Sequence, residues 1–207
     1  MDSNTRAPVG VNRTGDRLLD SVVDLLETDG YDAVQLREVA RRARTSLTTI
    51  YKRYATREEL IVAAIEHWMT QNHSGLVAQP RDPDEPLHSA MMRVMRAIFD
   101  PWERHPAMLL AYFRVRTSAS GGDLAFRSFD PVVAVGMAVL SDLDPDFVAD
   151  LESILSSLVY GLAGRYREGH IAITDIMPTL DRTVFLLTTG YEASRRDEEA
   201  RSTSRQV

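Results

Sequence analysis

Apolar positions recur every three to four residues through most of the chain, which is the period of amphipathic helices. The first such run predicts a helix from a cap near Thr14 to Asp29, and Gly30 is the predicted left-handed stop. The sequence contains no alternating strand pattern with hairpin signals and no internal repeat. The chain is therefore predicted to be all-α.

Polar capping residues divide the next stretch into three helices. Residues 35–44 predict a short helix, and Ser46 is a good N-cap for a second one that ends within 51–54. Thr56 with Glu59 three residues later matches a capping box, which predicts a longer helix ending near Asn72.

The remainder of the chain predicts a surface loop at 74–86 and then five helices. These are expected at 87–103, 106–117, 124–140, 145–168 and 174–191. Pro131 is expected to break or kink its helix, whereas Asp144 before Pro145 and Gly169 after the last turn mark strong helix ends. The polar segment after Glu192 is expected to fray. The predicted organisation is a flexible arm (1–13), a DNA-binding domain (14–60), an effector-binding and dimerisation domain (61–191) and a polar tail (192–207).

Composition excludes several classes of protein. The chain has no cysteine, which rules out disulfides and thiolate metal sites and fits a reducing cytoplasm. No apolar run approaches the roughly 20 residues of a membrane span, and the polar N-terminus lacks the apolar region of a signal peptide. The histidines show no helical metal-binding pair, and no phosphate-binding loop, dinucleotide fingerprint or nucleophile elbow is present. We therefore expect no enzyme, metal or cofactor.

Charge is distributed very unevenly. The net charge is −6, but the window from Ala33 to Arg57 carries +6, which leaves −12 on the rest of the chain. A basic segment on an acidic body can face a polyanion, although an Arg-rich solvated face is the alternative interpretation. The seven cations of this basic window are Arg37, Arg41, Arg42, Arg44, Lys52, Arg53 and Arg57.

The two short helices, with about three residues between them, describe a helix-turn-helix. In that motif the second helix lies in the major groove of DNA with its N-terminal residues at base edges. Its threonines and lysine can reach bases, while neighbouring arginines and hydroxyls can hold phosphates. A short helix pair also occurs in ordinary helical cores, so a helical scaffold that does not bind DNA remains the alternative, with a small-molecule enzyme less favoured.

Three stretches in this region are GYDAVQLREVA at 30–40, SLTTIYKRY at 46–54 and REEL at 57–60. Together they resemble the TetR family of bacterial transcriptional regulators over about Leu18 to Ala64. Three positions depart from the family pattern: Gln35 stands where a threonine cap is usual, Arg44 where a turn glycine is common, and Thr48 where a small residue is common. Arg44 bears on the turn geometry, and Thr48 on which bases are read.

The resemblance implies a three-helix DNA-binding domain joined by a connecting helix to a helical domain that binds an inducer. It also implies a homodimer that binds double-stranded DNA at a palindromic operator. The residues expected to contact DNA are Arg37, Ser46, Leu47, Thr48, Thr49, Tyr51, Lys52, Arg53 and Arg57. Of these, Thr48, Thr49 and Lys52 would approach bases, while the resemblance places Leu36, Val39, Ile50 and Tyr54 in the core.

Methionines interleaved with aromatic residues characterise the first half of the C-terminal domain. Such side chains can line an adaptable apolar cavity, although plain core packing is the alternative for any one of them. The predicted ligand-binding residues are Met91, Met95, Phe99, Trp102, Met108, Tyr112, Phe113, Arg116, Phe129, Met137 and Tyr160. The expected effector is a small apolar or amphipathic molecule.

The chain also resembles regulators of lipid or sterol catabolism that respond to acyl-CoA thioesters. Such a ligand needs cations near the pocket mouth, and Arg114, Arg116 and Arg165 are candidates, while His105, Tyr112 and Tyr160 are further candidates for the polar end.

The two final predicted helices carry more apolar side chains than one exposed face accounts for. A two-fold arrangement of four helices would bury them, and closure of the protomer's own core is the alternative. The predicted dimer residues are Leu155, Leu158, Leu162, Ile176, Leu180, Val184 and Leu187.

Overall fold

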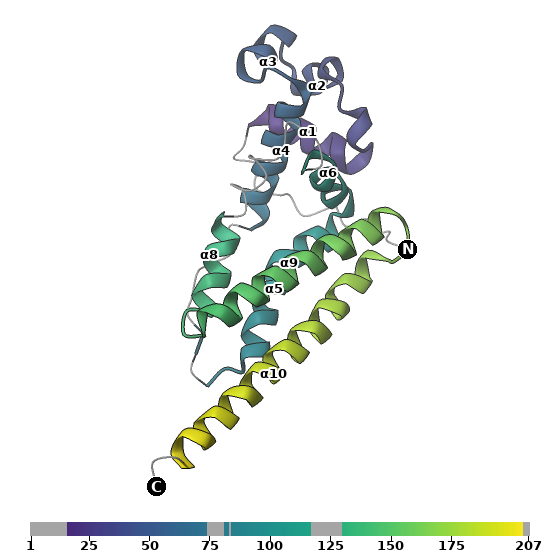
Figure 1. Cartoon of the computed structure of the whole chain (residues 1–207). Helices are drawn as coiled ribbons and strands as arrows, with labels where there is room; N and C mark the ends of the chain where they lie inside the picture. The colour runs from purple at the N-terminus through teal and green to yellow at the C-terminus, as the bar shows by residue number, and fades with distance from the viewer. Residues whose placement is uncertain (1–15, 74–80, 83, 117–129, 205–207) are drawn as a thin grey trace, which may run out of the picture.

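The computed structural model describes residues 16–73, 81–82, 84–116 and 130–204, and every regular element within these ranges is helical. The helices form a small head and an elongated body, with the long last helix running along the body and past its lower end (Figure 1). The predicted all-α class is confirmed.

The head contains the first helices of the chain. In order these are α1 (Arg17–Thr28), the 3₁₀ turn η1 (Tyr31–Ala33), α2 (Leu36–Ala43), α3 (Leu47–Arg53) and α4 (Arg57–Asn72). Helix α1 packs against α2 and α4 because its apolar stripe, including the fully buried Val22 and Leu26, faces them. Helix α4 leaves the head and connects it to the body.

The body contains α5 (Leu87–Arg104), α6 (Pro106–Arg116), α8 (Asp130–Val139), α9 (Pro145–Arg167), η2 (Ile173–Asp175) and α10 (Ile176–Ser204). Helix α10 packs along α5 and α9, α5 contacts α8, and α6 reaches up to α1 and α4. Buried apolar residues form two clusters. The first core fills the head and continues into α6 and the facing ends of α9 and α10, and the second core lies between α5, α8, α9 and α10.

Several helix ends form as the sequence predicts. The Asp144 carboxylate accepts hydrogen bonds from the backbone N–H groups of Asp146 and Phe147 at the start of α9. At the other end Gly169 adopts φ +74°, and the N–H groups of Gly169 and His170 donate to the carbonyls of Tyr166 and Arg165, as in a Schellman motif.

Other boundaries differ from the predictions. Asp16 caps α1 by accepting from Leu18 N–H, whereas the expected cap, Thr14, lies outside the described residues. Gly30 has positive φ (+82°), but its ψ of 177° takes it out of the left-handed helical region. The helix expected at 124–140 is described only from Asp130.

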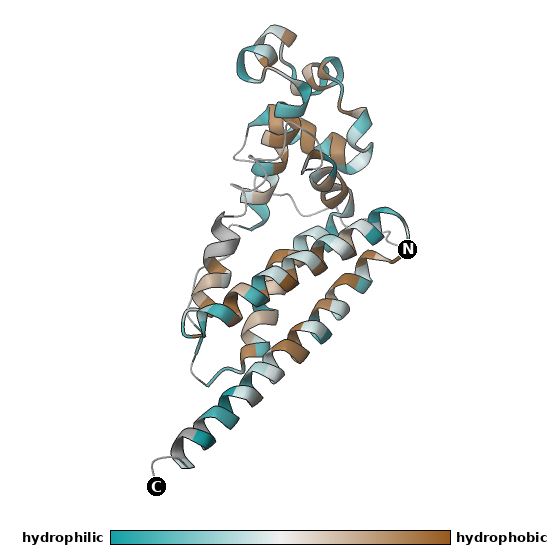
Figure 2. Ribbon diagram, in the orientation of Figure 1, coloured by the Kyte–Doolittle hydropathy of each residue, from teal (hydrophilic) through white to brown (hydrophobic). Residues whose placement is uncertain are grey.

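The prediction that the chain frays after Glu192 is wrong. Helix α10 continues to Ser204, and Figure 2 shows that this last part is hydrophilic where it leaves the body. A polar segment without an apolar face can still continue a packed helix, because extending a helix adds one hydrogen bond per residue without a new nucleus.

Among the described helices, α9 alone is long and apolar enough to cross a membrane by length and composition. The expectation from sequence was that no apolar run approached this length. One such helix is weak evidence for a membrane span, and 22% of its apolar window is buried within the protomer.

Candidate DNA-binding surface

The turn between α2 and α3 is a Schellman motif closed by an arginine. Arg44 adopts φ +53° and ψ +45°, and among the described non-glycine residues it alone has positive φ. The Thr45 N–H donates to the Ala40 carbonyl at 3.0 Å, and the Arg44 N–H donates to the Arg41 carbonyl at 3.4 Å. The left-handed turn therefore forms despite the absence of the usual glycine.

Helix α3 is positioned by one polar cap and one apolar anchor. The Ser46 hydroxyl accepts from the Thr49 N–H at 3.0 Å, and Ile50 is fully buried in the first core. This anchoring leaves Thr48, Thr49, Tyr51 and Lys52 exposed, with Tyr51 57% exposed. Leu47 is only half-buried and packs against the first core. The outward face of α3 thus carries hydroxyls, a phenol and an ammonium group.

Four of the seven cations of the basic window are held by partners within the head. Arg41 and Arg42 both bind the Glu38 carboxylate, at 2.6 and 2.8 Å, and they lower the pKa of Glu38 to about 2. Arg42 also pairs with Asp29 at 3.0 Å.

Arg53 and Arg57, both expected to contact DNA, are the other two. Arg53 pairs with Asp16 across the head, and this contact lowers the pKa of the aspartate. The Arg57 guanidinium is turned inward: its Nε donates to the Val34 carbonyl at 2.5 Å, and a terminal nitrogen donates to the Tyr31 carbonyl. Arg57 therefore fastens the start of α4 to η1.

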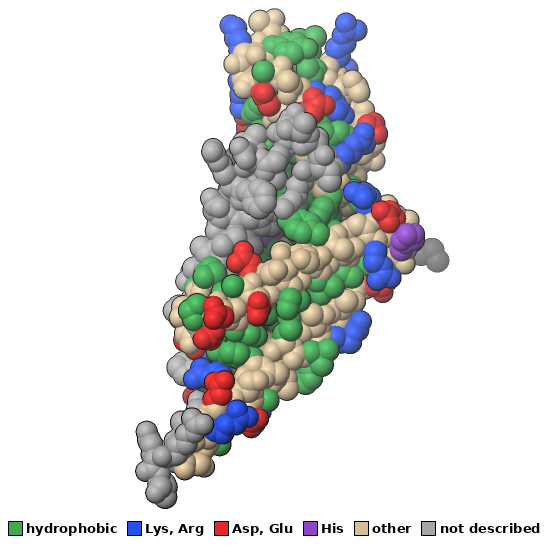
Figure 3. All heavy atoms as spheres, viewed as in Figure 1, with side chains coloured by type: hydrophobic (Ala, Val, Ile, Leu, Met, Phe, Trp, Pro, Cys, Tyr) green, Lys and Arg blue, Asp and Glu red, His purple; other side chains and the backbone are tan. Residues whose placement is uncertain are grey.

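The exposed cations of the head that have no ion-pair partner among the described residues lie on α1, α2, the turn after α2, and α3. Arg37 and Lys52 were expected; Arg17 at the start of α1 and Arg44 at the turn were not assigned to DNA binding. None of the four forms an ion pair with a described carboxylate. Arg17 was missed because it lies outside the basic window, and only packing of α1 on α2 brings it to the same part of the head. Figure 3 shows basic side chains on both flanks of the tip that α2 and α3 form.

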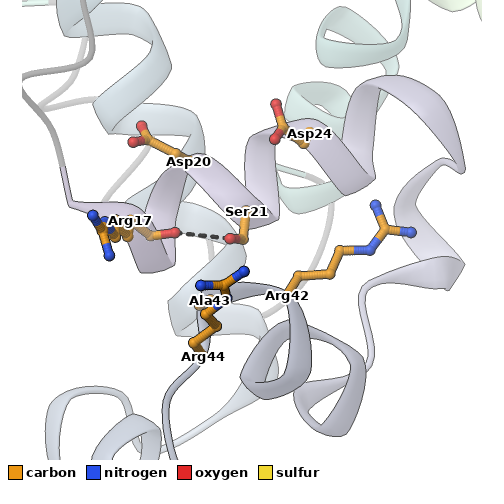
Figure 4. A pocket seen from close by; sticks show the side chains of 7 residues that line it. All are labelled: Arg17, Asp20, Ser21, Asp24, Arg42, Ala43 and Arg44. Atoms are coloured by element: carbon orange, nitrogen blue, oxygen red, sulfur yellow. Dashed lines mark hydrogen bonds between the residues drawn. The ribbon is translucent and has the colours of Figure 1, made fainter.

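Arg17 and Arg44 also line a hollow of about 510 Å³ between α1 and α2. Figure 4 shows Asp20 and Asp24 on its α1 side and Arg42 and Arg44 on its α2 side. The mixed charges make this hollow polar, and it contains none of the residues predicted to bind an effector.

The structure brings together only part of the predicted ligand-binding set. Trp102, Tyr112, Phe113 and Tyr160 form a row of aromatic rings with centroids 5.3 to 6.1 Å apart, drawn from α5, α6 and α9. Met108 is fully buried in the same first core.

The other members of that set lie elsewhere. Met91 and Met95 belong to the second core, and Phe99 packs against both cores. Met137 is 48% exposed, away from any such row. Phe129 and the Arg116 side chain lie outside the described residues.

The predicted dimer residues point into the protomer, which is the alternative that the sequence left open. Five of the seven are buried, and Leu158 and Leu187 are half-buried against the two cores. The exposed large apolar side chains of α9 and α10 are instead Ile154, Tyr160, Phe185 and Leu186. Helical period alone cannot tell which of two apolar faces the protomer buries.

Polar contacts join the body to the head. Arg114 on α6 binds Asp32 in η1 at 2.7 and 2.8 Å and lies over the Tyr31 ring, with its guanidinium carbon 4.2 Å from the centroid. His105 Nδ1 lies 2.7 Å from Glu27 on α1. Arg114 and His105, candidates for the polar end of an effector site, therefore contact the head.

The fold and this surface define a helix-turn-helix DNA-binding protein with a helical body, and comparison with known proteins agrees. Residues 18–64 match the profile of bacterial regulatory proteins of the tetR family, and residues 85–187 match that of the tetracyclin repressor-like C-terminal domain. The chain is 30% identical to the HTH-type transcriptional repressor KstR of Rhodococcus jostii, over 88% of this chain and 85% of that protein.

Solved structures show the same fold. A TetR transcriptional regulator from Rhodococcus sp. RHA1 matches with a TM-score of 0.60 at 22% identity, covering 83% of this chain and 92% of that one. A TetR from Streptomyces coelicolor also gives 0.60, at 19% identity and with 87% and 98% coverage. The chain belongs to the TetR family and is a transcriptional regulator with a helix-turn-helix DNA-binding domain.

Proposed function

We propose that this regulator is a cytoplasmic repressor. It binds a palindromic operator as a homodimer and is released when a small apolar or amphipathic effector, of lipid or acyl-CoA type, occupies its body. The observation that carries the DNA-binding half of the proposal is the outward face of α3, where Thr48, Thr49, Tyr51 and Lys52 are exposed on a helix fixed by Ser46 and Ile50. The similarity to a named repressor supports the sign of regulation.

In this proposal the chemistry of each side chain decides whether it contacts bases or phosphates. The threonine hydroxyls and the Lys52 ammonium read base edges in the major groove. Arg37, with Arg17 and Arg44 on the flanks, neutralises phosphates, since these cations are exposed and unpaired within the described residues. Arg53 and Arg57 keep the head rigid rather than contacting phosphate.

The proposed dimer uses the exposed apolar side chains of the last two long helices. Phe185 is 53% and Leu186 69% exposed on α10, and Ile154 on α9 is 43% exposed. Large exposed apolar groups on neighbouring helices favour burial against a second copy. A two-fold dimer would present two α3 helices to successive major grooves, which matches a palindromic site.

The proposed effector site lies along the row of aromatic rings from Trp102 to Tyr160. Two rings of this row, Tyr112 and Phe113, belong to α6. The same helix carries Arg114, which contacts the head. An effector that binds one arrangement of α6 better than another would shift the head positions in the dimer. The two α3 helices would then no longer match successive grooves.

Salt-dependent binding to a duplex from the promoter beside its own gene tests the DNA-binding function. Affinity should fall steeply with salt, because each phosphate contact releases counterions. Lys52→Glu should abolish most binding, whereas Arg96→Glu, the same reversal at an exposed site on α5, should leave it unchanged. Thr49→Ala should change sequence preference more than non-specific affinity. A protein that shows no salt-sensitive binding to this duplex would instead be a helical scaffold.

A further inference from the structure

A second hollow, of about 430 Å³, lies at the end of the body far from the head. Its lining comes from three separate parts of the chain. These are Arg81 before α5 with Leu87 at its start, Leu143 before α9, and Tyr191, Glu192, Arg195 and Arg196 on α10. The volume falls within the range of small-molecule sites. None of the residues predicted from sequence to bind a ligand belongs to it.

Apolar groups form one side of this distal hollow. Leu87 is fully packed in the second core, and Leu143 is half-buried against the same core. The Tyr191 ring is stacked on Phe147 with their centroids 3.9 Å apart, and its hydroxyl accepts a hydrogen bond from the Asp144 N–H. These contacts hold the ring in place, so the apolar wall is formed before any ligand binds.

Charged groups form the other side. The lining contains the guanidinium groups of Arg81, Arg195 and Arg196 and the carboxylate of Glu192. Arg81 is fixed by a hydrogen bond to the Glu85 carbonyl at 2.9 Å and by the Asp142 carboxylate at 2.5 Å. Its Nε is buried and has no acceptor among the described residues, and a buried donor without an acceptor is costly. An oxygen atom reaching this nitrogen would recover that cost.

From these features we propose that the distal hollow is a second ligand site, which binds a small anionic amphiphile with its charged head at Arg196 and Arg81 and its apolar tail on Leu143 and Tyr191. Guanidinium groups bind carboxylate or phosphate heads through charge-assisted hydrogen bonds. The apolar wall accounts for the tail. The site is separate from the proposed effector site, because its lining shares no residue with the aromatic row.

Octanoate tests this site in the full-length protein without DNA, so the result is independent of the proposed operator binding. Titration calorimetry should show octanoate binding more tightly than octanol, which lacks the charge, or acetate, which lacks the tail. Arg196→Glu should weaken octanoate binding by about tenfold, the value of one lost charge-assisted hydrogen bond. Arg201→Glu, the same reversal further along the exposed end of α10, should leave it within about twofold.

Methyl NMR then locates the ligand. Shifts at Leu87 and Leu143 that saturate with octanoate would support the site. The proposal is overturned if the wild-type protein binds no octanoate at millimolar concentration, if Arg196→Glu binds it as tightly as the wild type, or if the shifts centre on Met91 and Met108 instead. Arg196 is exposed, so circular dichroism of this variant is expected to match the wild type. If Arg196→Glu weakens the binding of decylphosphate as much as that of octanoate, the site selects for negative charge rather than for a carboxylate.

Discussion

Replacing Arg44 by glycine should stabilise the protein while weakening its binding to DNA. Arg44 occupies the left-handed region at the C-terminus of α2, where its backbone completes the two hydrogen bonds of the turn. A side chain with a Cβ costs about 1–2 kcal/mol in this conformation relative to glycine. Glycine in turn has a more disordered unfolded state, which takes back about 0.4–1 kcal/mol.

The net gain is therefore about 1 kcal/mol, which for a chain of 207 residues corresponds to a rise of about 2–4 °C in the midpoint of thermal unfolding. The matched control is Arg44→Ala, which removes the same charge but keeps the Cβ. Both variants lose the exposed cation that precedes α3. The salt dependence of operator binding should therefore decrease by the same amount in both. Only the glycine variant should gain stability.

Chemical denaturation and fluorescence anisotropy on labelled operator measure the two effects separately. If the glycine variant is no more stable than the alanine variant, the strain assigned to the left-handed backbone is absent. If the two variants differ in their salt dependence, the loss reflects turn geometry rather than charge. Either result would refute the separation of backbone and charge at Arg44.

Three further expectations concern other parts of the chain. Glu38→Gln should reduce the loss of folding stability at acid pH. The ionised Glu38 carboxylate stabilises the fold above its ordinary pKa of 4.5, and this contribution is lost as the pH falls through its lowered pKa of about 2. An unchanged acid limb by circular dichroism would contradict the pairing with two arginines. Arg57→Gln should lower the free energy of unfolding by about 2 kcal/mol without changing the salt dependence of DNA binding, whereas a slope reduced by about 0.9 would identify a phosphate contact. Leu186→Glu should yield monomers in sedimentation velocity, with Leu110→Glu, at another exposed apolar position on α6, remaining dimeric; equal masses for both would place the dimer surface elsewhere.

The sequence by itself determined the helical class, most helix ends and the position of α3. These features depend on short-range physics: the helical period, the Ser46 and Asp144 caps and the Gly169 stop act within one or two turns.

Tertiary packing decided which charges and which apolar faces are available. Arg57 belongs to the basic window in sequence, but the fold places the Tyr31 carbonyl in η1 and the Val34 carbonyl just after it within its reach. Arg17, distant in sequence, joins the exposed cations because α1 packs on α2. Leu180 and Leu186 have the same apolar character, yet one is fully buried and the other 69% exposed. A periodic pattern shows that a helix has apolar faces, but long-range contacts decide which face the protomer buries, because burial depends on neighbours that the local sequence does not contain.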